Sequence, residues 1–304
     1  MKLKSCIRRR PFYGGAWAGA VVLIAASTQA QILYVAGGDN NNIVEVTPGG
    51  SQSVFVSGLN GAGGLAFDSA GNLFATDGSG NINELTPSAS RSTFASGLSN
   101  PGGIAFNSLG NLFVADGGSG NIYEYTPGGT RTTFASGLSS PNGLAFNSSG
   151  DLFVADGGSG NLYEFTPGGA RSTFASGLIY PAGLAFNSSG DLFESDFLGG
   201  NINEFTPGGA ESTFASGWLY PQALAFDTTG NLYLFEGSYL NAAVIQFTPG
   251  GAHSIFASGF TVPTTDGLAF QGVTLPVPEP SVLGLLTAGV GALLVYRRRR
   301  CDLT

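Results

Sequence analysis

The stretch Gly143-Leu-Ala-Phe-Asn-Ser-Ser-Gly-Asp-Leu-Phe-Val-Ala-Asp156 contains the pattern from which the architecture is predicted. Its two short apolar runs flank Asn147-Ser-Ser-Gly150, a sequence typical of a tight turn. Downstream, residues 161–165 and 171–175 form two further short strand-like runs, each preceded by a Gly-rich connection. Four strands in about 40 residues, with no helix-period segment between them, indicate one blade of a β-propeller.

The same unit recurs along the chain. A Thr-Pro pair recurs with its Pro at positions 48, 87, 127, 167, 207 and 249. Phe-x-Ser-Gly and Ala-Phe recur with the same period, also in six copies. Three independent markers therefore predict six blades. WD-type repeats share this period, but their Gly-His and Trp-Asp signatures are absent.

The order of the strands predicts how the ring closes. The chain enters at Ile32-Leu-Tyr-Val-Ala36, which matches a second strand, and leaves at Asp266-Gly-Leu-Ala-Phe270, which matches a first strand. One blade is therefore expected to be composite, with one C-terminal strand beside three N-terminal strands. Such pairing leaves no long open edge. We predict an all-β, six-bladed β-propeller of four-stranded blades over residues 31–275.

The repeated motif Gly-Leu-Ala-Phe-x-x-x-Gly-Asn/Asp-Leu-Phe-x-x-Asp carries a family resemblance. It resembles NHL-type propellers and the wider group of gluconolactonase-like and streptogramin-lyase-like propellers. The resemblance spans most of residues 31–275 and implies the fold. It implies an activity only weakly, because propellers host many functions.

Composition excludes several classes of protein. Between residues 31 and 275 the chain has three Arg, no Lys and 18 acidic residues. Such a surface repels phosphate, so nucleic-acid binding is not expected. It could attract cations, or it could be a solvated acidic shell. Cys6 and Cys301 lie in the terminal segments, so the middle has no Cys-based metal, catalytic or disulfide site.

Residues 1–30 are typical of a secretory signal peptide. A basic segment is followed by an apolar run over 16–26, and Thr28 and Ala30 fit a cleavage site before Gln31. The alternative is an uncleaved N-terminal anchor. Either reading predicts export across the inner membrane.

Residues 276–304 resemble a second targeting signal, at the C-terminal end of the sequence. Pro278, Glu279 and Pro280 precede an apolar run over 282–296 and a tail of four Arg, which should stay cytoplasmic. This arrangement resembles the PEP-CTERM sorting signal of Gram-negative bacteria, and the apolar run is expected to form a helix. The resemblance implies processing by an exosortase-type enzyme and delivery to the cell surface or extracellular polymer. The alternative is a plain membrane anchor.

The residue before each Gly-Leu-Ala-Phe motif should face the central channel. Three of these positions break the repeat with polar residues, namely Asn142, Gln222 and Asp266. Asn142 and Asp266 resemble metal-ligand positions of gluconolactonase-like propellers, where the Asp can serve as base. Ca²⁺ takes six to eight oxygens, and the family's early Glu has no counterpart here. The alternative is that these are turn residues, so no cofactor is expected beyond a possible Ca²⁺ or other divalent metal.

The loops at the same face carry unusual aromatic residues in one sector. We expect an exposed patch that binds a ligand, made of Tyr180, Phe197, Trp218, Tyr220 and Tyr239. The alternative is that these side chains pack on one another.

Two further features have structural interpretations. An acid ends each second strand, as at Asp116 and Asp156, and is expected to bond the backbone of the following Gly-rich loop. The single His, His253, replaces the Arg of its repeat and should neighbour Gln246 across a hairpin. Streptogramin-type lyases use a His as base, but His253 should lie near the outer strands, remote from the channel.

These observations favour a non-catalytic, monomeric binding protein whose partner is an extracellular polysaccharide or a surface protein. The alternative is a metal-dependent, lactonase-like hydrolase with its site at the channel mouth. A lyase that uses His253 is a third reading.

Overall fold

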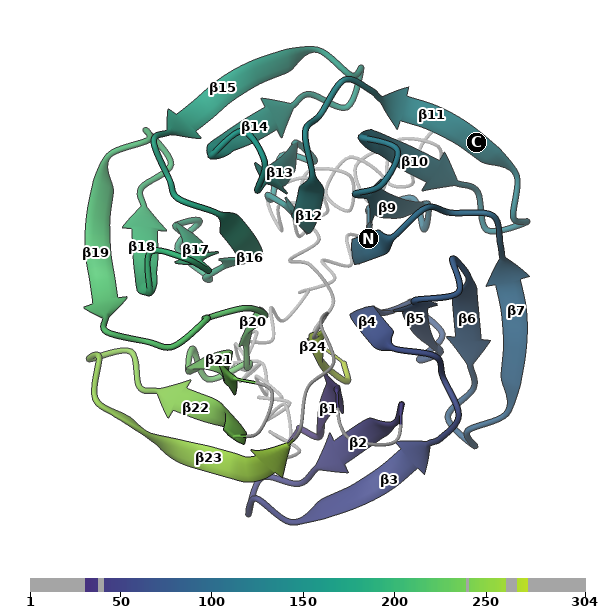
Figure 1. Cartoon of the computed structure of the whole chain (residues 1–304), viewed down its shortest axis with the longest axis horizontal. Coiled ribbons are helices and arrows are strands. Elements are labelled where there is room, and N and C mark those ends of the chain that lie inside the picture. The colour runs from purple at the N-terminus through teal and green to yellow at the C-terminus, as the bar shows by residue number, and fades with distance from the viewer. Residues whose placement is uncertain (1–30, 38–40, 239–240, 261–266, 273–304) are drawn as a thin grey trace, which may run out of the picture.

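The computed structural model describes residues 31–37, 41–238, 241–260 and 267–272. These residues form six four-stranded antiparallel sheets around a central axis (Figure 1). The prediction of an all-β, six-bladed propeller is confirmed. The predicted signal peptide over 1–30 and the sorting segment over 276–304, with Pro278, Glu279, Pro280 and the expected helix, lie outside the described residues. No helix in the described part of the chain is long and apolar enough to cross a membrane.

Each blade runs from an inner first strand to an outer fourth strand. The composite blade contains β24 (Leu268–Phe270), β1 (Leu33–Ala36), β2 (Ile43–Val46) and β3 (Gln52–Val56). Blade one contains β4 (Ala62–Phe67), β5 (Leu73–Asp77), β6 (Ile82–Leu85) and β7 (Arg91–Ala95). Blade two contains β8 (Pro101–Phe106), β9 (Leu112–Asp116), β10 (Asn121–Tyr125) and β11 (Arg131–Ala135). Blade three contains β12 (Pro141–Phe146), β13 (Leu152–Asp156), β14 (Asn161–Phe165) and β15 (Arg171–Ser176). Blade four contains β16 (Pro181–Phe186), β17 (Leu192–Asp196), β18 (Asn201–Phe205) and β19 (Glu211–Ser216). Blade five contains β20 (Leu224–Phe226), β21 (Leu232–Ser238), β22 (Asn241–Phe247) and β23 (His253–Phe260).

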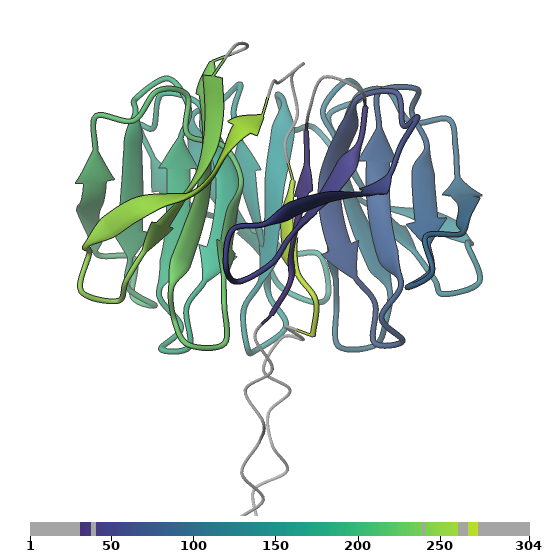
Figure 2. The same ribbon diagram turned by 90° about the horizontal axis from the view of Figure 1, so that it is seen from below.

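The composite blade closes the ring as predicted. Strand β24 pairs with β1, with Leu33 opposite Phe270 and Val35 opposite Leu268. The backbone N–H of Gln271 donates to the carbonyl of Ile32 at 3.2 Å, so the two ends of the described chain lie side by side. Figure 2 shows both ends on one face of the disc, which is the face where the first strands finish.

The turn between the first and second strands explains why the motif folds as a hairpin. The side-chain Oδ1 of Asn147 accepts hydrogen bonds from the backbone N–H groups of Ser149 and Asp151, at 3.0 and 2.8 Å. Gly150 has a φ of 86°, a conformation that glycine adopts without steric cost. Asp or Asn at the first position of this turn therefore fixes the hairpin from local sequence.

Aromatic side chains hold neighbouring blades together. In blade three, the Phe153 ring contacts Phe174 of its own fourth strand and Phe186 of the next blade, at centroid distances of 5.0 and 5.1 Å. Both contacts are edge-to-face, the geometry that aromatic pairs prefer. The same three-ring contact recurs at all six interfaces, and Tyr233 with Phe270 completes it at the closure. The repeated Phe residues thus supply the core between blades.

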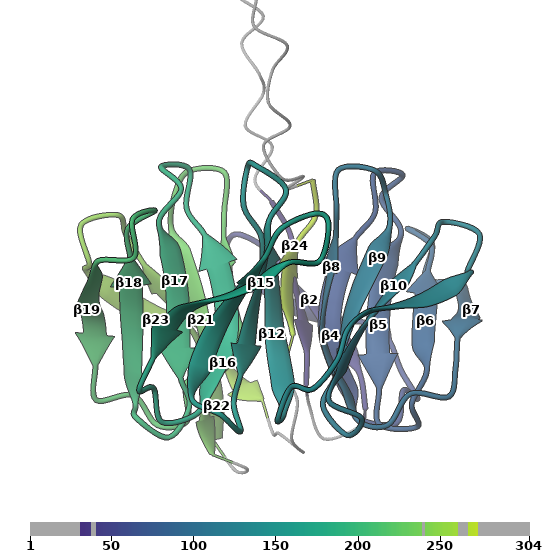
Figure 3. The same ribbon diagram turned by 90° about the horizontal axis from the view of Figure 1, so that it is seen from above.

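The first strands, among them β8, β12 and β24, lie near the middle of the disc (Figure 3). A ring of small residues lets neighbouring first strands approach one another closely. A Cβ added at Gly64 would lie 2.5 Å from the carbonyl oxygen of Gly102, and one at Gly103 would lie 2.6 Å from that of Asn142. Gly143, Gly183 and Gly267 face the next blade's carbonyl in the same way. These glycines set how narrow the channel is, and their backbones line its mouth.

Candidate functional site

A pocket of about 490 Å³ opens at one mouth of the central channel. Its volume lies within the range of about 300–1,000 Å³ that is usual for small-molecule sites. Deeper in the channel, the pocket is lined by a ring of Leu and Ile side chains that come one residue after the small residues in each first strand. Each of these side chains is 6–8% exposed. The upper wall of the pocket comes from the loops that join fourth to first strands and second to third strands. The mouth lies opposite the face on which the described chain begins and ends.

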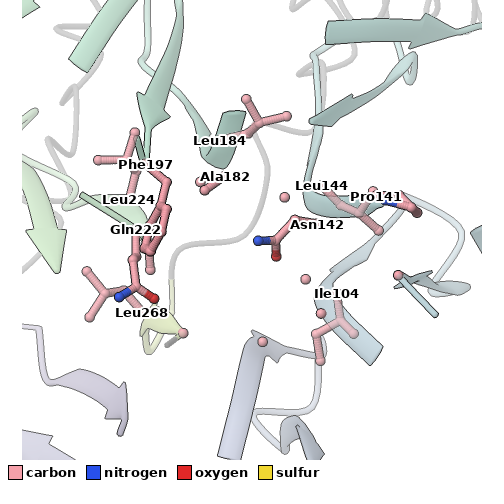
Figure 4. Close-up of a pocket in the computed structure, with 18 of the residues that line it drawn as sticks. Ile104, Pro141, Asn142, Leu144, Ala182, Leu184, Phe197, Gln222, Leu224 and Leu268 are labelled. Atoms are coloured by element: carbon pink, nitrogen blue, oxygen red, sulfur yellow. The ribbon is translucent and has the colours of Figure 1, made fainter. Parts of the chain in front are cut away.

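The pocket brings together two of the three polar positions predicted from the broken repeat. Asn142 begins blade three and Gln222 precedes β20 of blade five, and Figure 4 shows both side-chain amides in the cavity. A Cβ on Gly102 would lie 2.9 Å from the Oδ1 of Asn142, so the absent side chain of Gly102 gives that amide its room. Asp266, the third predicted position, lies outside the described residues. Gly267, which follows it, lines the pocket.

The backbone of Gln222 is held from the neighbouring blade. The buried Ser195 hydroxyl donates to the carbonyl oxygen of Gln222 and accepts from the backbone N–H of Gly183. The N–H of Gln222 donates to the carbonyl of Phe235 at 2.9 Å. The backbone of Gln222 is therefore held by hydrogen bonds from both blade four and blade five, and the hydrogen bond from blade four joins residues far apart in the sequence.

Three of the five predicted aromatic residues meet at the rim of this pocket. The Phe197 ring stacks on Tyr220 with centroids 5.0 Å apart and planes at 29°, and it lies 5.8 Å from the Tyr180 ring. Tyr220 has a φ of 52°, which is unfavourable for an aromatic residue and indicates a backbone held in place by its surroundings.

Trp218 does not join this patch, and that part of the prediction needs correction. Its ring packs edge-on against Phe247 and His253, at 5.3 and 5.2 Å, within the apolar cluster between blades four and five. Trp218 occupies the position that a packed Leu holds in the earlier repeats, which explains why it points inward. Tyr239 lies outside the described residues.

The acids at the ends of the second strands have structural roles, but the carboxylates of Asp116 and Asp156 bond a different loop from the one predicted. They accept backbone hydrogen bonds from the loop before the first strand, and from the following Gly-rich loop they accept only the hydroxyls of Ser119 and Ser159. Asp196 is 3% exposed and accepts backbone hydrogen bonds from Ile179 and Tyr180 at 2.8 and 2.9 Å, and from Gly199 at 3.2 Å. Asp156 binds the N–H groups of Ser139 and Ser140 in the same way. Each of these two carboxylates thus bonds both the loop before the first strand and the loop after the second strand of its blade, and both loops lie at the channel mouth.

The described side chains of the pocket are uncharged, and their donor set does not fit a divalent cation. Asn142 and Gln222 offer two neutral amide oxygens, whereas Ca²⁺ takes six to eight oxygens, several of them anionic. Among the described residues, no three His, Cys, Asp or Glu side chains are placed to hold a metal ion. The chemistry of the described pocket is therefore that of amide donors and acceptors beside aromatic rings.

One buried acid was missed by the sequence reasoning. Glu194 stands in β17 where the two preceding blades have Val114 and Val154, and its side chain is 0% exposed. Asn203 donates to its Oε2 at 2.9 Å, while its Oε1 has no hydrogen-bond partner among the described residues. Burial raises the pKa of Glu194 from 4.5 to about 8, so it is largely protonated at neutral pH. The break in the repeat at an apolar position was the signal that could have revealed it.

His253 lies far from the channel, as expected, but its strand register differs. His253 starts β23, is exposed and pairs with Phe247, while Gln246 pairs with Ser254. The predicted neighbours are offset by one residue because the turn at the tip contains three residues, 249–251, between the paired Thr248 and Ala252. His253 packs on Trp218 and is remote from the pocket.

No protein-family model and no curated protein sequence matches the chain. Solved structures do share the fold. A chain of the nidogen/laminin complex is 21% identical over 79% of this chain and 98% of its own, with a TM-score of 0.69. A gluconolactonase from Xanthomonas campestris is 19% identical over 76% and 83%, with a TM-score of 0.61. A virginiamycin B lyase from Staphylococcus aureus is 15% identical over 76% and 86%, with a TM-score of 0.58.

These neighbours correct one expectation. The sequence favoured a protein without catalytic activity, whereas the gluconolactonase and the lyase that share its fold are enzymes. The expectation of a non-enzyme is therefore contradicted. At identities below a quarter the likeness shows the fold, and it does not by itself assign a substrate.

Proposed function

We propose that the protein is a hydrolase that opens an uncharged lactone or ester at the channel mouth. The observation that carries this proposal is the meeting of Asn142 and Gln222, two polar breaks in the repeat, in one pocket. The gluconolactonase with the same fold supports the reaction class. The described lining offers amide and apolar groups, which suit the neutral carbonyl of a lactone or ester.

The reaction is the addition of water to an acyl carbon. Water attacks the carbonyl carbon, the bond from that carbon to the ring oxygen breaks, and a hydroxy acid is released. The amide N–H groups of Asn142 and Gln222 are suited to donate to the carbonyl oxygen as it gains negative charge. Asp266 directly precedes the pocket residue Gly267 and is the proposed base that takes the proton of the water and then returns it to the departing oxygen.

Hydrolysis of D-glucono-1,5-lactone, followed by acid release at constant pH, tests the proposal. Asn142→Ala should lower kcat/KM about 100-fold, as loss of an oxyanion donor does elsewhere. Gly102→Ala keeps Asn142 but puts a Cβ against its amide, so it should also lower kcat/KM without unfolding the protein. Leu109→Ser changes an exposed turn residue and is the matched control. No hydrolysis of this lactone or of simple esters by the wild type would overturn the proposal.

We also propose that the protein is exported, held in the inner membrane until an exosortase-type enzyme processes it, and then delivered to the cell surface or extracellular polymer. The support is the order of elements in residues 1–30 and 276–304. With both ends of the described chain opposite the mouth, such an anchor would present the pocket outward. Mass spectrometry of the protein from its cells should find Gln31 as the first residue and the apolar tail removed. An intact chain in the cytoplasm would contradict this.

A further inference from the structure

The rim of the pocket carries a concentrated apolar surface in one sector. Among the described residues, seven large apolar side chains are exposed, and four of them lie on the three loops around Tyr180 and Phe197. The four are Ile179 at 61%, Leu198 at 56%, Leu219 at 52% and Tyr220 at 40% exposed. We call these four residues, together with Tyr180 and Phe197, the apolar rim.

Sister loops show that the fold does not need these side chains. Blades two and three carry Ser99 and Ser139 at the position of Ile179 and Leu219. They carry Gly-Gly, as at Gly117-Gly118, where this sector has Phe197-Leu198. The propeller therefore closes the corresponding loops of other blades with small residues. Large apolar side chains that are exposed here do not stabilise the fold, and an exposed apolar surface of this kind indicates a binding site for a ligand.

The apolar rim is held rigidly and joins the pocket. Asp196 fixes the backbone of Ile179 and Tyr180, and the N–H of Phe197 donates to the carbonyl of Tyr180 at 3.0 Å. Tyr180 and Phe197 line the pocket, and the Phe197 ring stacks on Tyr220 of the apolar rim. None of the three loops carries a charged residue. A ligand can thus lie across both surfaces without ordering a loop.

We propose that the substrate is amphipathic, with its lactone or ester group in the pocket and an alkyl chain lying over the apolar rim. This inference deepens the proposed function and rests on it for the identity of the polar group. A protein partner is a poorer fit, because stable interfaces take about 20–30 residues from each side and the apolar rim offers six. A flexible alkyl chain matches a narrow apolar strip that continues from the pocket.

The test is calorimetric binding of γ-lactams that carry straight alkyl chains from methyl to octyl. Lactams keep the ring and carbonyl of a lactone but resist hydrolysis, so affinity is measured without turnover. For the wild type, the Kd should fall about twofold to fourfold with each added methylene, because each one loses contact with water. The variant Ile179→Ser with Leu219→Ser should lose this dependence and still bind the methyl lactam equally well.

The controls follow from the sister repeats. Ser at both positions reproduces Ser99 and Ser139, so the double variant should fold, which its thermal unfolding will verify. Leu109→Ser with Ile255→Ser removes two exposed apolar residues away from the mouth and should keep the full dependence on chain length. A wild-type Kd that is independent of chain length, or a double variant that keeps the dependence, would overturn the inference.

Two other outcomes separate this inference from the hydrolase proposal. Lactam binding that strengthens with chain length, without hydrolysis of any lactone, would refute the hydrolase and leave the amphipathic ligand standing. Lactone hydrolysis with no effect of chain length on rate or affinity would do the reverse. A third outcome would assign the apolar rim to a membrane and refute the inference. In that outcome the wild type sediments with neutral phosphatidylcholine vesicles, the double variant does not, and the Kd for the lactams is independent of chain length.

Discussion

At pH 9 the Glu194→Gln variant is expected to be roughly 5 kcal/mol more stable than the wild type, and at pH 4 the two should be nearly equal. Burial raises the pKa of Glu194 from 4.5 to about 8 in the folded protein. Because the folded pKa is raised, the unfolded chain loses this proton first. The wild type therefore keeps its full stability below pH 4.5 and loses stability as the pH rises towards 8, by about 1.4 kcal/mol per unit.

The physical reason lies in the surroundings of Glu194. Leu184 and Asn203 flank it in the sheet, and its strand face packs on the apolar cluster between blades three and four. Asp196 and Glu211 add negative charge that further opposes its ionisation. No cation is among the causes that shift its pKa.

Urea unfolding followed by circular dichroism between pH 4 and pH 9 measures this effect. A second variant, Glu194→Val with Asn203→Tyr, restores the pair that blade three has at Val154 and Tyr163. This double variant should also be more stable than the wild type at alkaline pH. Agreement between the two variants would show that the effect comes from removing the carboxyl group and not from a contact made by the glutamine. If the free energy of unfolding changed by the same amount between pH 5 and pH 8 in the wild type and in Glu194→Gln, Glu194 would ionise freely in the folded protein and the prediction would be wrong.

Gly143→Ala is expected to destabilise the propeller by about 3 kcal/mol or more. The new Cβ would collide with the backbone carbonyl of Ala182 in the next blade. Backbone cannot move aside as a flexible side chain can, so the two inner strands must separate. The backbone of Gly143 has an ordinary φ, so the loss is steric and does not come from conformational strain. The pocket should widen at the same time, because Gly143 and Ala182 both line it.

Thermal unfolding gives the measurement, and Gly168→Ala gives the control. Gly168 belongs to the same blade, and a Cβ there would meet only the Thr166 Oγ1, at an ordinary 3.9 Å. For a domain of this size, 3 kcal/mol corresponds to a fall in Tm of about 6–12 °C. Equal Tm values for the two variants would mean that the inner strands are not packed as tightly as the glycine ring requires.

Part of the candidate site could be predicted from the repeats. Asn142 and Gln222 were found because they break a periodic pattern at a position that the blade arrangement turns to the channel. Tyr180, Phe197 and Tyr220 were found as departures from Ser and Gly in sister loops. Trp218 was misplaced because the same argument could not tell an enlarged core residue from an exposed one. That distinction depends on which cluster the side chain enters.

The number of blades, the strands of each blade and the composite closure follow from local sequence, because the turns and the alternation of apolar residues repeat six times. The repeats also indicate that the acids at the ends of the second strands bond nearby backbone, but not which loop they bond. Contacts between blades are needed to see that Ser195 fixes Gln222, that the buried Glu194 has Asn203 as its one side-chain partner among the described residues, and that Phe197 joins the pocket to the apolar rim. These features arise between blades, where residues far apart in the chain meet and no local pattern records their contact.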